Sequence, residues 1–560
     1  MSRESLNIMI GGEAGQGLVT IGQVLAKALI RSGHHILVTQ DYMSRVRGGH
    51  NTFTIRAATH ELDSPCEGVD LLIALNQETL DLHGGELRPG AVVVAGQGLS
   101  CAGAECLSVP YGELAGDRHL NTVALGVGAG LLGLDPELVA EVLAAALGKK
   151  KGDQVVADNQ KVLSDSLAWL EGQEVPFDSL APAQVSGKRL MLGGNQAIAL
   201  GALAAGLKFL AFYPMTPSTS IALTVIAHAD DLGVVYEQAE DEIAAINMAL
   251  GAAYAGAPAM VCTSGGGFAL MTEGLSLAGM TETPIVIAIA MRPGPATGLP
   301  TRSEQGDLLF ALHGGHGEFP RAILAPGGVR QCFEAGYQAL HLAEKFQGPV
   351  FILTNQFLAD SLRALEPFDL SGREPVRPGG QGKQGEAYQR YEITADGISP
   401  RRLPGLGPEL VVADSDEHTE QGHITEDLAL RARMNHKRLT KEKGLRAETF
   451  PPVFEGPEDP ELLLVSWGSS QGPVAAAART LRDEGQSVAT CHFSQVWPLD
   501  PEQFAPRMAS AGQVVVIEGN ATGQFAGLLR KEAGIAAQRF IGRCDGLNLT
   551  PEYILRQMAS

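Results

Sequence analysis

Short apolar runs alternate with Ala-rich helical patterns along most of the chain, and glycine- and proline-rich turns separate them. Residues 207–301 show this arrangement most clearly, because three strand-like runs there each lead into a turn rich in Pro, Gly, Ser or Thr. Such alternation predicts α/β domains built on parallel sheets. Ligand sites in these sheets lie just beyond the carboxyl ends of strands, so we expect the functional site in this stretch.

The pattern divides the chain into four parts. Residues 1–180 start with a strand, a glycine-rich turn and a helix, and a polar, turn-rich segment separates them from residues 189–370. Residues 371–458 begin with a Gly- and Pro-rich stretch without a period and include a charged helix, so we expect a linker or lid there. Residues 459–560 alternate again. The predicted fold class is therefore α/β, with several doubly wound domains.

Composition excludes several classes of protein. The 560 residues carry a net charge of -21, which disfavours nucleic-acid binding because an acidic surface repels phosphate backbones. No apolar run approaches the roughly 20 residues that cross a bilayer, and no secretory signal precedes the first strand, so we expect a cytoplasmic protein. The seven cysteines include no C-x-x-C pair; we expect no metal site, no iron–sulfur cluster and no disulfide framework in this chain.

The N-terminal strand–helix turn is a candidate phosphate site, since free N–H groups and missing side chains suit an anion. A nearby loop adds a hydroxyl and two guanidinium groups that suit phosphate oxygens. The candidate residues are Gly12, Gly15, Gly17, Ser44, Arg45 and Arg47. The alternatives are glycines that serve only helix packing and a solvated basic loop. An NAD site with its ribose at Asp41 is a third alternative, although Ala14 fits the dinucleotide pattern poorly.

Two residues in the central stretch have a distinctive setting. Pro214 and Pro217 flank Thr216, which holds its hydroxyl on a stiff turn suited to ligand binding. Glu242 shares a helical face with an apolar stripe, and a buried carboxyl must be protonated or hydrogen-bonded. Helical spacing alone leaves Asp241 as an alternative. The stripe consists of Ile246, Ala249, Leu250 and Ala253, and the acids expected only to favour the helix N-terminus are Glu237, Glu240 and Asp241.

Further candidates follow. Arg292 ends a buried strand, where it could bind a small carboxylate through two hydrogen bonds; the alternative is an ion pair with Glu304 or Asp307. A metal site is a weak hypothesis for three histidines among acids, because none of them are spaced i, i+4; they are His418, His423 and His436. The basic run on the following helix is typical of a solvated face, and the alternative is a contact with a phosphate or a partner; its residues are Lys437, Arg438, Lys441 and Lys443.

The motifs YPMTPST, EDEIAAINMALGAAYAG, TSGGGFALM and AMRPGPATGLPT together resemble the α subunit of 2-oxoacid:ferredoxin oxidoreductases. The segment GGEAGQG…SRVRGGH resembles the γ domain of that family, fused in front of α, and residues 459–560 resemble its transketolase C-terminal-like domain. The order γ then α is most similar to 2-oxoglutarate:ferredoxin oxidoreductase. The resemblance makes residues 189–370 a thiamine diphosphate pyrimidine-binding domain.

The resemblance implies a role for each candidate. Glu242, rather than Asp241, hydrogen-bonds the aminopyrimidine ring of thiamine diphosphate; Thr216 lies near the reacting centre, with Tyr213 and Pro214 beside the cofactor. Arg292 and Thr301 hold the substrate carboxylate, which orients the carbonyl group for attack. In the family coenzyme A accepts the acyl group, and residues 1–180 are the candidate site for its phosphates.

The resemblance also implies a partner. No GDG motif with a distant Asn, the pattern that holds magnesium and diphosphate, occurs in this sequence, and no cluster cysteines occur. In the family a β subunit carries the Mg site and a [4Fe-4S] cluster, so we expect a dimer of heterodimers that passes electrons to ferredoxin through β. The substrate stays open among 2-oxoglutarate, pyruvate and branched 2-oxoacids, as does the direction, oxidation or reductive carboxylation as in the reductive TCA cycle. Rival hypotheses are an NAD-dependent dehydrogenase and a non-catalytic scaffold.

Overall fold

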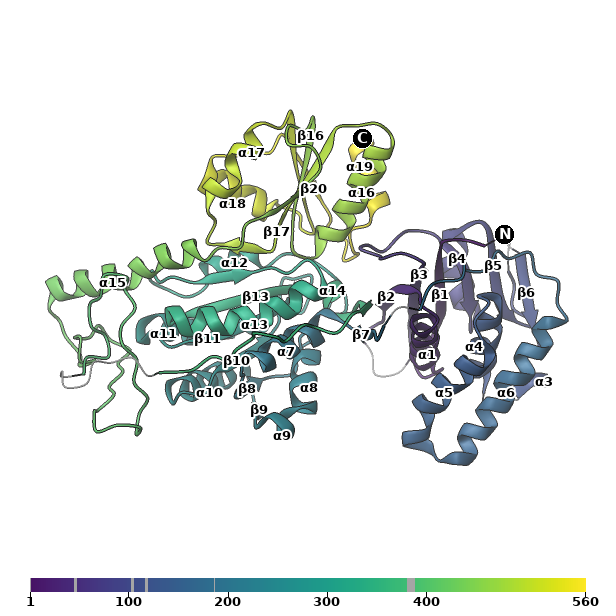
Figure 1. Cartoon of the computed structure of the whole chain (residues 1–560), viewed down its shortest axis with the longest axis horizontal. Coiled ribbons are helices and arrows are strands. Elements are labelled where there is room, and N and C mark those ends of the chain that lie inside the picture. Colours follow the sequence, from purple (N-terminus) through teal and green to yellow (C-terminus); the bar gives the residue numbers. More distant parts are fainter. Residues whose placement is uncertain (1, 45–47, 102–104, 116–118, 186, 380–387) are drawn as a thin grey trace. The chain divides into compact units, whose positions relative to one another are not determined.

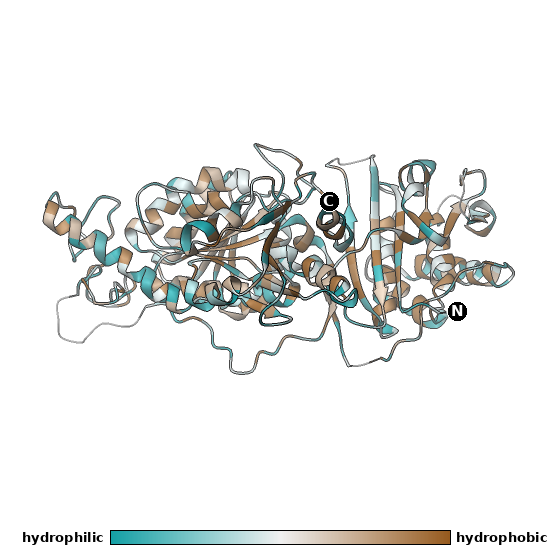
Figure 2. Cartoon of the chain, turned by 90° about the horizontal axis from the view of Figure 1, so that it is seen from above, coloured by the Kyte–Doolittle hydropathy of each residue, from teal (hydrophilic) through white to brown (hydrophobic). Residues whose placement is uncertain are grey.

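The computed structural model describes residues 2–44, 48–101, 105–115, 119–185, 187–379 and 388–560. The chain forms two compact units. Unit 1 comprises Met1–Leu192, Ser361–Pro367 and Thr550–Glu552, and unit 2 comprises Gly193–Asp360, Phe368–Leu549 and Tyr553–Ser560. Sheets flanked by helices make up both units (Figure 1), so the predicted α/β class is confirmed. Apolar residues are concentrated in the strands of these sheets (Figure 2).

Unit 1 is built on an eight-stranded mixed sheet in the order β6-β5-β4-β1-β3-β2-β14-β7. Its strands are β1 (Ser5–Glu13), β2 (His35–Asp41), β3 (His50–Ala58), β4 (Val69–Ala74), β5 (Leu87–Gly96), β6 (Glu105–Val109), β7 (Leu190–Leu192) and β14 (Leu362–Leu365). Strands β1, β4, β5 and β6 are parallel, whereas β3 lies between β1 and β2 and is antiparallel to both. No strand was predicted at β3, because half of its side chains are polar.

Helices cover both faces of this sheet unequally. One face packs against α1 (Leu18–Arg31), α4 (Leu120–Leu131), α5 (Pro136–Lys151) and α6 (Asp153–Glu171), and the other against the short α2 (Gln77–His83). Alternation along β1 produces this division, since Ile8 and Ile10 join the core under the four helices while Met9 joins Leu80 of α2. A disulfide joins Cys101 to Cys106, a bond that composition had not led us to expect.

The larger sheet of unit 2 has the order β18-β12-β13-β11-β10-β8-β9, and all of its strands except β18 are parallel. They are β8 (Phe209–Phe212), β9 (Val235–Gln238), β10 (Ala259–Thr263), β11 (Ile285–Met291), β12 (Ala322–Leu324), β13 (Pro349–Asn355) and β18 (Gln495–Trp497). Helices α7 (Gly194–Ala204), α8 (Thr219–Ala227) and α13 (Val329–Phe346) pack together on one face, and α10 (Glu242–Tyr254), α11 (Gly265–Thr281) and α12 (Leu308–His313) cover the other. Burial on both faces explains the continuous apolar runs of β10, β11 and β13.

A smaller sheet follows in the order β15-β17-β16-β19-β20. Its strands are β15 (Val453–Glu455), β16 (Leu462–Trp467), β17 (Val488–Phe493), β19 (Gln513–Glu518) and β20 (Arg539–Gly542), flanked by α16 (Gln471–Asp483), α17 (Ala505–Ala509), α18 (Gln524–Ala533) and α19 (Pro551–Ala559). One apolar cluster contains both Phe268 and Met291 of the larger sheet layer and Trp467 and Phe525 of the smaller one. The two sheets of unit 2 therefore share a continuous core.

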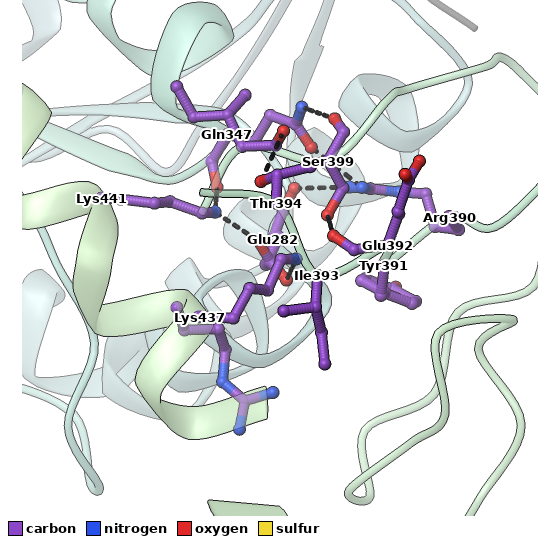
Figure 3. Close-up of polar contacts among 12 residues, drawn as sticks. Glu282, Gln347, Arg390, Tyr391, Glu392, Ile393, Thr394, Ser399, Lys437 and Lys441 are labelled. Atoms are coloured by element: carbon purple, nitrogen blue, oxygen red, sulfur yellow. Dashed lines mark hydrogen bonds and ion pairs between the residues drawn. The ribbon is translucent and has the colours of Figure 1, made fainter. Parts of the chain in front are cut away.

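A buried polar cluster fixes α15 (Leu428–Ala447) to the end of α11 (Figure 3). Lys437 Nζ lies 2.5 Å from Glu282 Oε1, and Lys441 Nζ contacts the other oxygen of the same carboxylate. Arg390 donates to the Glu282 carbonyl oxygen at 2.8 Å and to Gln347 Oε1 at 2.9 Å. Three positive groups around this carboxylate lower the pKa of Glu282, although burial acts in the opposite direction.

The expectation of a solvated basic face is therefore wrong for most of the run on α15. Lys437, Arg438 and Lys441 are buried, and Arg438 donates two hydrogen bonds to Glu417 at 3.0 and 2.8 Å. Only Lys443 of the four is exposed. Spacing along the helix could not reveal the burial of these side chains, because their acidic partners, Glu282 and Glu417, lie outside the helix. His418 is also buried, and its ring packs at 4.0 Å against Tyr391.

No helix in the described part of the chain is long and apolar enough to span a membrane. Among the same residues, no group of three or more His, Cys, Asp or Glu side chains is arranged to hold a metal ion.

Candidate active site

The carboxyl ends of four neighbouring parallel strands, β9, β8, β10 and β11, define one edge of the larger sheet in unit 2. The predicted residues follow these ends directly. Thr216 comes after β8, Glu242 after β9 and Arg292 after β11, while the three glycines that start α11 follow β10. The expected position of the site, at the carboxyl edge of a parallel sheet, is thus the position at which the fold gathers these side chains.

Glu242 is the first residue of α10. Asp241 precedes the helix as its N-cap, and its side chain accepts a hydrogen bond from the Ala244 N–H at 2.7 Å. The predicted stripe is buried, and Glu242 itself is 4% exposed. Asp241 thus favours the helix N-terminus, as predicted. The same prediction is wrong for Glu237, because this residue lies in β9 (Val235–Gln238) and the helix starts later.

The carboxyl group of Glu242 packs against the start of α11. A Cβ atom at Gly267 would lie 2.7 Å from Glu242 Oε1, so this close approach requires a glycine. Glu242 Oε1 is buried and has no hydrogen-bond partner among the described residues. Because an unsatisfied buried oxygen of this kind costs about 1–3 kcal/mol, the arrangement is suited to a ligand that supplies the missing donor.

Arg292 connects two of the strand ends. Its Nη1 donates to the Thr216 carbonyl oxygen at 2.6 Å, which leaves the rest of the guanidinium for another acceptor. Burial lowers the pKa of Arg292, and the nearby negative charge of Asp307 acts in the opposite direction. In the described residues no ion pair joins Arg292 to Glu304 or Asp307, so the structural alternative for Arg292 has no direct contact to support it.

The remaining predicted residues of this site are less closely connected. Thr301 is 8% exposed and lies in the loop between β11 and α12. Among the described residues it forms no hydrogen bond to Arg292 or Thr216. Tyr213 is 40% exposed and Pro214 is exposed. The structure thus brings Thr216 and Arg292 into contact and leaves Tyr213 and Pro214 on the surface beside them.

Gln305 is a residue of this region that sequence reasoning missed. Its side chain, 1% exposed, accepts from the Gly519 N–H at 2.7 Å and donates to the Trp467 carbonyl oxygen at 2.9 Å. Its backbone N–H donates to the Gly519 carbonyl oxygen at 2.6 Å, and Gln524 Nε2 donates to the Gly306 carbonyl oxygen at 2.7 Å. The smaller sheet, for which the sequence indicated no chemistry, therefore holds the loop that carries Thr301.

Exposed apolar side chains occur on several elements of this layer. Ile243, next to Glu242, is 47% exposed, and other large apolar groups on the flanking elements are exposed as well. They are Tyr213, Leu223, Met248, Leu270 and Leu299. Scattered exposed apolar residues need no explanation, but Ile243 directly follows Glu242 in the chain and lines a cavity together with Leu270 of α11. This part of α10 and α11 is therefore a candidate surface for another polypeptide.

The glycine-rich turn of unit 1 differs from expectation. Gly12 lies inside β1, where a Cβ atom would lie 2.6 Å from Gln16 Oε1, and a Cβ atom at Gly17 would lie 2.5 Å from Asn121 Nδ2. Close packing therefore explains why Gly12 and Gly17 are glycines. At Gly15, with φ 104°, a Cβ atom would meet only open space. Ser44 is exposed, and Arg45 and Arg47 lie outside the described residues.

Strand order argues against the NAD alternative at this turn. In a dinucleotide-binding fold the first two strands are direct neighbours, so the acid ending the second reaches the ribose of a nucleotide bound after the first. Here β3 lies between β1 and β2, which moves Asp41 a further strand spacing, about 5 Å, away from the turn.

Comparison with known proteins covers the whole chain. A family model described as the thiamine-diphosphate-binding domain of pyruvate flavodoxin/ferredoxin oxidoreductases matches residues 200–437, and one for pyruvate ferredoxin/flavodoxin oxidoreductase matches residues 7–169. A transketolase C-terminal domain model matches residues 455–530. The α subunit of 2-oxoacid:ferredoxin oxidoreductase 2 from Aeropyrum pernix is 31% identical over 97% of this chain and 95% of its own length. The chain belongs to the 2-oxoacid:ferredoxin oxidoreductase family.

Other members of the 2-oxoacid:ferredoxin oxidoreductase family agree with this assignment. The 2-oxoglutarate oxidoreductase subunit KorA of Mycobacterium tuberculosis is 29% identical over 94% of this chain and 87% of its own. A solved structure of 2-oxoglutarate:ferredoxin oxidoreductase from Magnetococcus marinus, with 2-oxoglutarate, coenzyme A and succinyl-CoA bound, superposes with a TM-score of 0.94 at 32% identity, covering 100% of this chain and 99% of that one. The resemblance inferred from the motifs is confirmed, and the chain is one subunit of a multi-subunit oxidoreductase.

Proposed function

We propose that this chain is the fused γα subunit of a 2-oxoglutarate:ferredoxin oxidoreductase. The complete enzyme would convert 2-oxoglutarate and coenzyme A to succinyl-CoA and CO2, pass the electrons to ferredoxin, and run in reverse as a reductive carboxylase. The observation that carries the choice of substrate is the TM-score of 0.94 over the whole chain with an enzyme named for 2-oxoglutarate. Relatives named only as 2-oxoacid oxidoreductases keep pyruvate and branched 2-oxoacids as alternatives.

Thiamine diphosphate fits the residues at the carboxyl edge of the sheet. Glu242 Oε1 is buried, lies against Gly267 and has no hydrogen-bond partner within the described ranges of the chain, which suits a ring nitrogen that shares a proton with a carboxyl group. When bound, thiamine diphosphate supplies the carbon nucleophile and the electron sink for decarboxylation. Glu242 would hold the proton at the pyrimidine ring, and the exposed side chains of Tyr213 and Pro214 would border the cofactor.

The substrate would be held by the neighbouring groups. Arg292, anchored through Thr216, has guanidinium N–H groups left for a carboxylate, and Thr301 is a buried hydroxyl in the following loop. Binding the carboxylate on a guanidinium fixed at one end orients the carbonyl carbon and lowers the entropic cost of reaching the transition state. Thr216 would position this arginine and border the reacting carbon.

A β subunit would complete the site. This chain lacks the GDG motif and the cluster cysteines, so the diphosphate, Mg and the [4Fe-4S] cluster would belong to β, which would also receive ferredoxin. The exposed apolar side chains of Ile243 on α10 and Leu270 on α11, which line one cavity, are the proposed contact surface. We further propose a cytoplasmic dimer of heterodimers, that is, a heterotetramer.

Coenzyme A is proposed to contact unit 1. Gly15, open to solvent, and the exposed Ser44 are the described candidates, with Gly12 and Gly17 shaping the turn and Arg45 and Arg47 supplying charge. Replacing Arg45 and Arg47 together by Ala should raise the Michaelis constant for coenzyme A in the assembled enzyme, while that for the 2-oxoacid stays the same. An unchanged constant for coenzyme A would remove this assignment.

The central test is co-purification with the β subunit, followed by viologen reduction with a panel of 2-oxoacids. We expect the highest kcat/KM with 2-oxoglutarate, strict dependence on coenzyme A, and no activity and weak thiamine diphosphate binding for this chain alone. Preference for pyruvate or a branched 2-oxoacid would correct the substrate. Activity of the isolated chain would overturn the division of the site, and an inactive complex would favour a scaffold role.

A further inference from the structure

A second carboxyl group lies at the start of α11, and neither the fold nor the proposed reaction accounts for it. Gly265, Gly266 and Gly267 open this helix. Glu242 packs over Gly267, and the carboxyl of Asp307 packs over Gly265 in the same way, since a Cβ atom there would collide with both oxygens of Asp307. Two acids therefore lie over the first and third residues of one helix, next to the positive end of its dipole.

Asp307 does not serve the fold in the usual way. It occupies the N-cap position of α12, yet its side chain makes no capping hydrogen bond. Its Oδ2 is buried and has no hydrogen-bond partner among the described residues. An N-cap aspartate normally contributes about 1 kcal/mol through that bond, so the unused carboxyl is not explained by helix capping.

The charged groups that act on Asp307, Arg292 and Glu304, lie in the same connection between β11 and α12 as Asp307 itself. The first turn of α11, which packs against Asp307, contributes glycines and no charged side chain. Burial and the Glu304 carboxylate raise the pKa of Asp307 to about 6, against the opposing effect of Arg292, and burial raises the pKa of Glu304 as well.

We propose that Asp307 is a positioning residue that sets how tightly Arg292 binds the substrate carboxylate, an inference that rests on the proposed role of Arg292. When ionised, Asp307 competes with the substrate for the positive charge of Arg292 and repels the incoming anion. When protonated, it does neither. The geometry that carries this is the buried Asp307 carboxyl packed over Gly265, with Oδ2 lacking a hydrogen-bond partner among the described residues; the charge of Arg292 acts on this carboxyl.

The proposal makes a linked prediction about protons. If the substrate anion binds beside Asp307, its charge must raise the affinity of Asp307 for a proton, and binding near neutral pH must then take up a fraction of a proton from the buffer. The dissociation constant should rise with pH through the range in which Asp307 ionises. A purely structural role for Asp307 would change stability but would produce no proton uptake.

The experiment uses the complex with the β subunit and glutarate, a dicarboxylate that lacks the reacting carbonyl. Titration calorimetry between pH 6.5 and 8.5, where both carboxyl groups of glutarate are ionised, uses buffers of different ionisation enthalpy and gives both affinity and proton uptake without turnover. For the wild type we expect about threefold weaker binding at pH 8.5 than at pH 6.5, and proton uptake that is largest at the lower pH. Asp307→Asn should bind more tightly than the wild type at both pH values, without a pH slope and without uptake. Asp483→Asn, which removes an exposed aspartate on α16, should behave as the wild type.

Two further variants separate the possible failures. Glu304→Gln should shift the uptake to lower pH, and this shift tests the proposal even if Asp307→Asn does not fold. Arg292→Lys should weaken glutarate binding at all pH values; if it does not, the proposed substrate site itself fails, and with it the role of Asp307. If Arg292→Lys weakens binding but Asp307→Asn keeps the pH slope and proton uptake of the wild type, only the inference about Asp307 is overturned.

Discussion

Three side chains around the first turn of α11 carry buried polar atoms that find no hydrogen-bond partner in the described part of the chain. These atoms are Glu242 Oε1, Ser264 Oγ and Asp307 Oδ2. Proteins satisfy the large majority of buried polar side-chain atoms, so three exceptions around one helical turn indicate a region shaped for a ligand rather than for stability.

Glu242→Gln tests the central residue. The amide cannot carry the proton that the carboxyl shares with the cofactor ring, so we expect kcat of the complex to fall about 100-fold or more while the complex still assembles. The matched control is the preceding residue, because Asp241→Ala removes the N-cap hydrogen bond, costs about 1 kcal/mol of stability and should leave most of the activity. Near-normal turnover of Glu242→Gln would contradict the assignment.

Asp307→Asn should stabilise the chain in a pH-dependent way. In the wild type the pKa of Asp307 rises from the ordinary 3.8 to about 6 in the folded state, so the folded form binds the proton more tightly than the unfolded form. The stability that depends on this proton is present in acid and is lost as pH rises through about 6. Measured by urea denaturation, the advantage of Asp307→Asn over the wild type should grow by about 1 kcal/mol between pH 5 and pH 8. A constant difference would indicate an ordinary surface aspartate.

Sequence reasoning reached Thr216, Glu242 and Arg292 because each has a local signal: flanking prolines, an apolar helical stripe and the end of a buried strand. Asp307 and Gln305 carry no such signal. Gln305 is polar, in a loop, and its partners Gly519 and Trp467 lie more than 150 residues away, so only the folded chain reveals that it is buried.

At the scale of elements, strands and helices with a clear period were predicted well. The N-terminal strand and helix occur as β1 and α1, and the three strand-like runs of residues 207–301 occur as β8, β10 and β11. The prediction of a solvated face on α15 is wrong, because a helix rich in Lys and Arg looks solvated in sequence unless its buried acidic partners are known. The strand β3 was not predicted, because many of its side chains are polar although the strand lies inside a sheet.

The buried cluster on α15 should be a large contributor to the stability of unit 2. Glu282→Gln leaves Lys437 and Lys441 buried without a counter-ion, and removing one partner from such a cluster costs about 3–5 kcal/mol. Glu273→Gln, an exposed site on α11, is the matched control and should change stability by less than about 0.5 kcal/mol. Guanidinium denaturation of both variants checks this, and equal midpoints would show that the cluster contributes little.

At the scale of the whole molecule, the proposed partner surface can be tested without touching the buried acid. Ile243→Asp places a charge on an exposed position of α10, so the chain should fold while its complex with β dissociates. Val453→Asp in β15, with a nearly equal exposure of 46% against 47%, should assemble normally. Size-exclusion chromatography of the co-expressed subunits, with viologen reduction of the eluted complex, gives the result; an intact complex of Ile243→Asp would exclude this surface.

The attachment of the 301–307 loop has a consequence for changing substrate preference. Gln305 hydrogen-bonds to backbone groups of Gly519 and Trp467, and a Cβ atom at position 519 would lie 3.2 Å from Gln305 Oε1. A loop transplanted from a relative with another preference should therefore be held correctly only when it keeps a glutamine at position 305 and the recipient keeps a glycine at position 519. Two positions far apart in the gene would then have to be inherited together, as a single module of specificity.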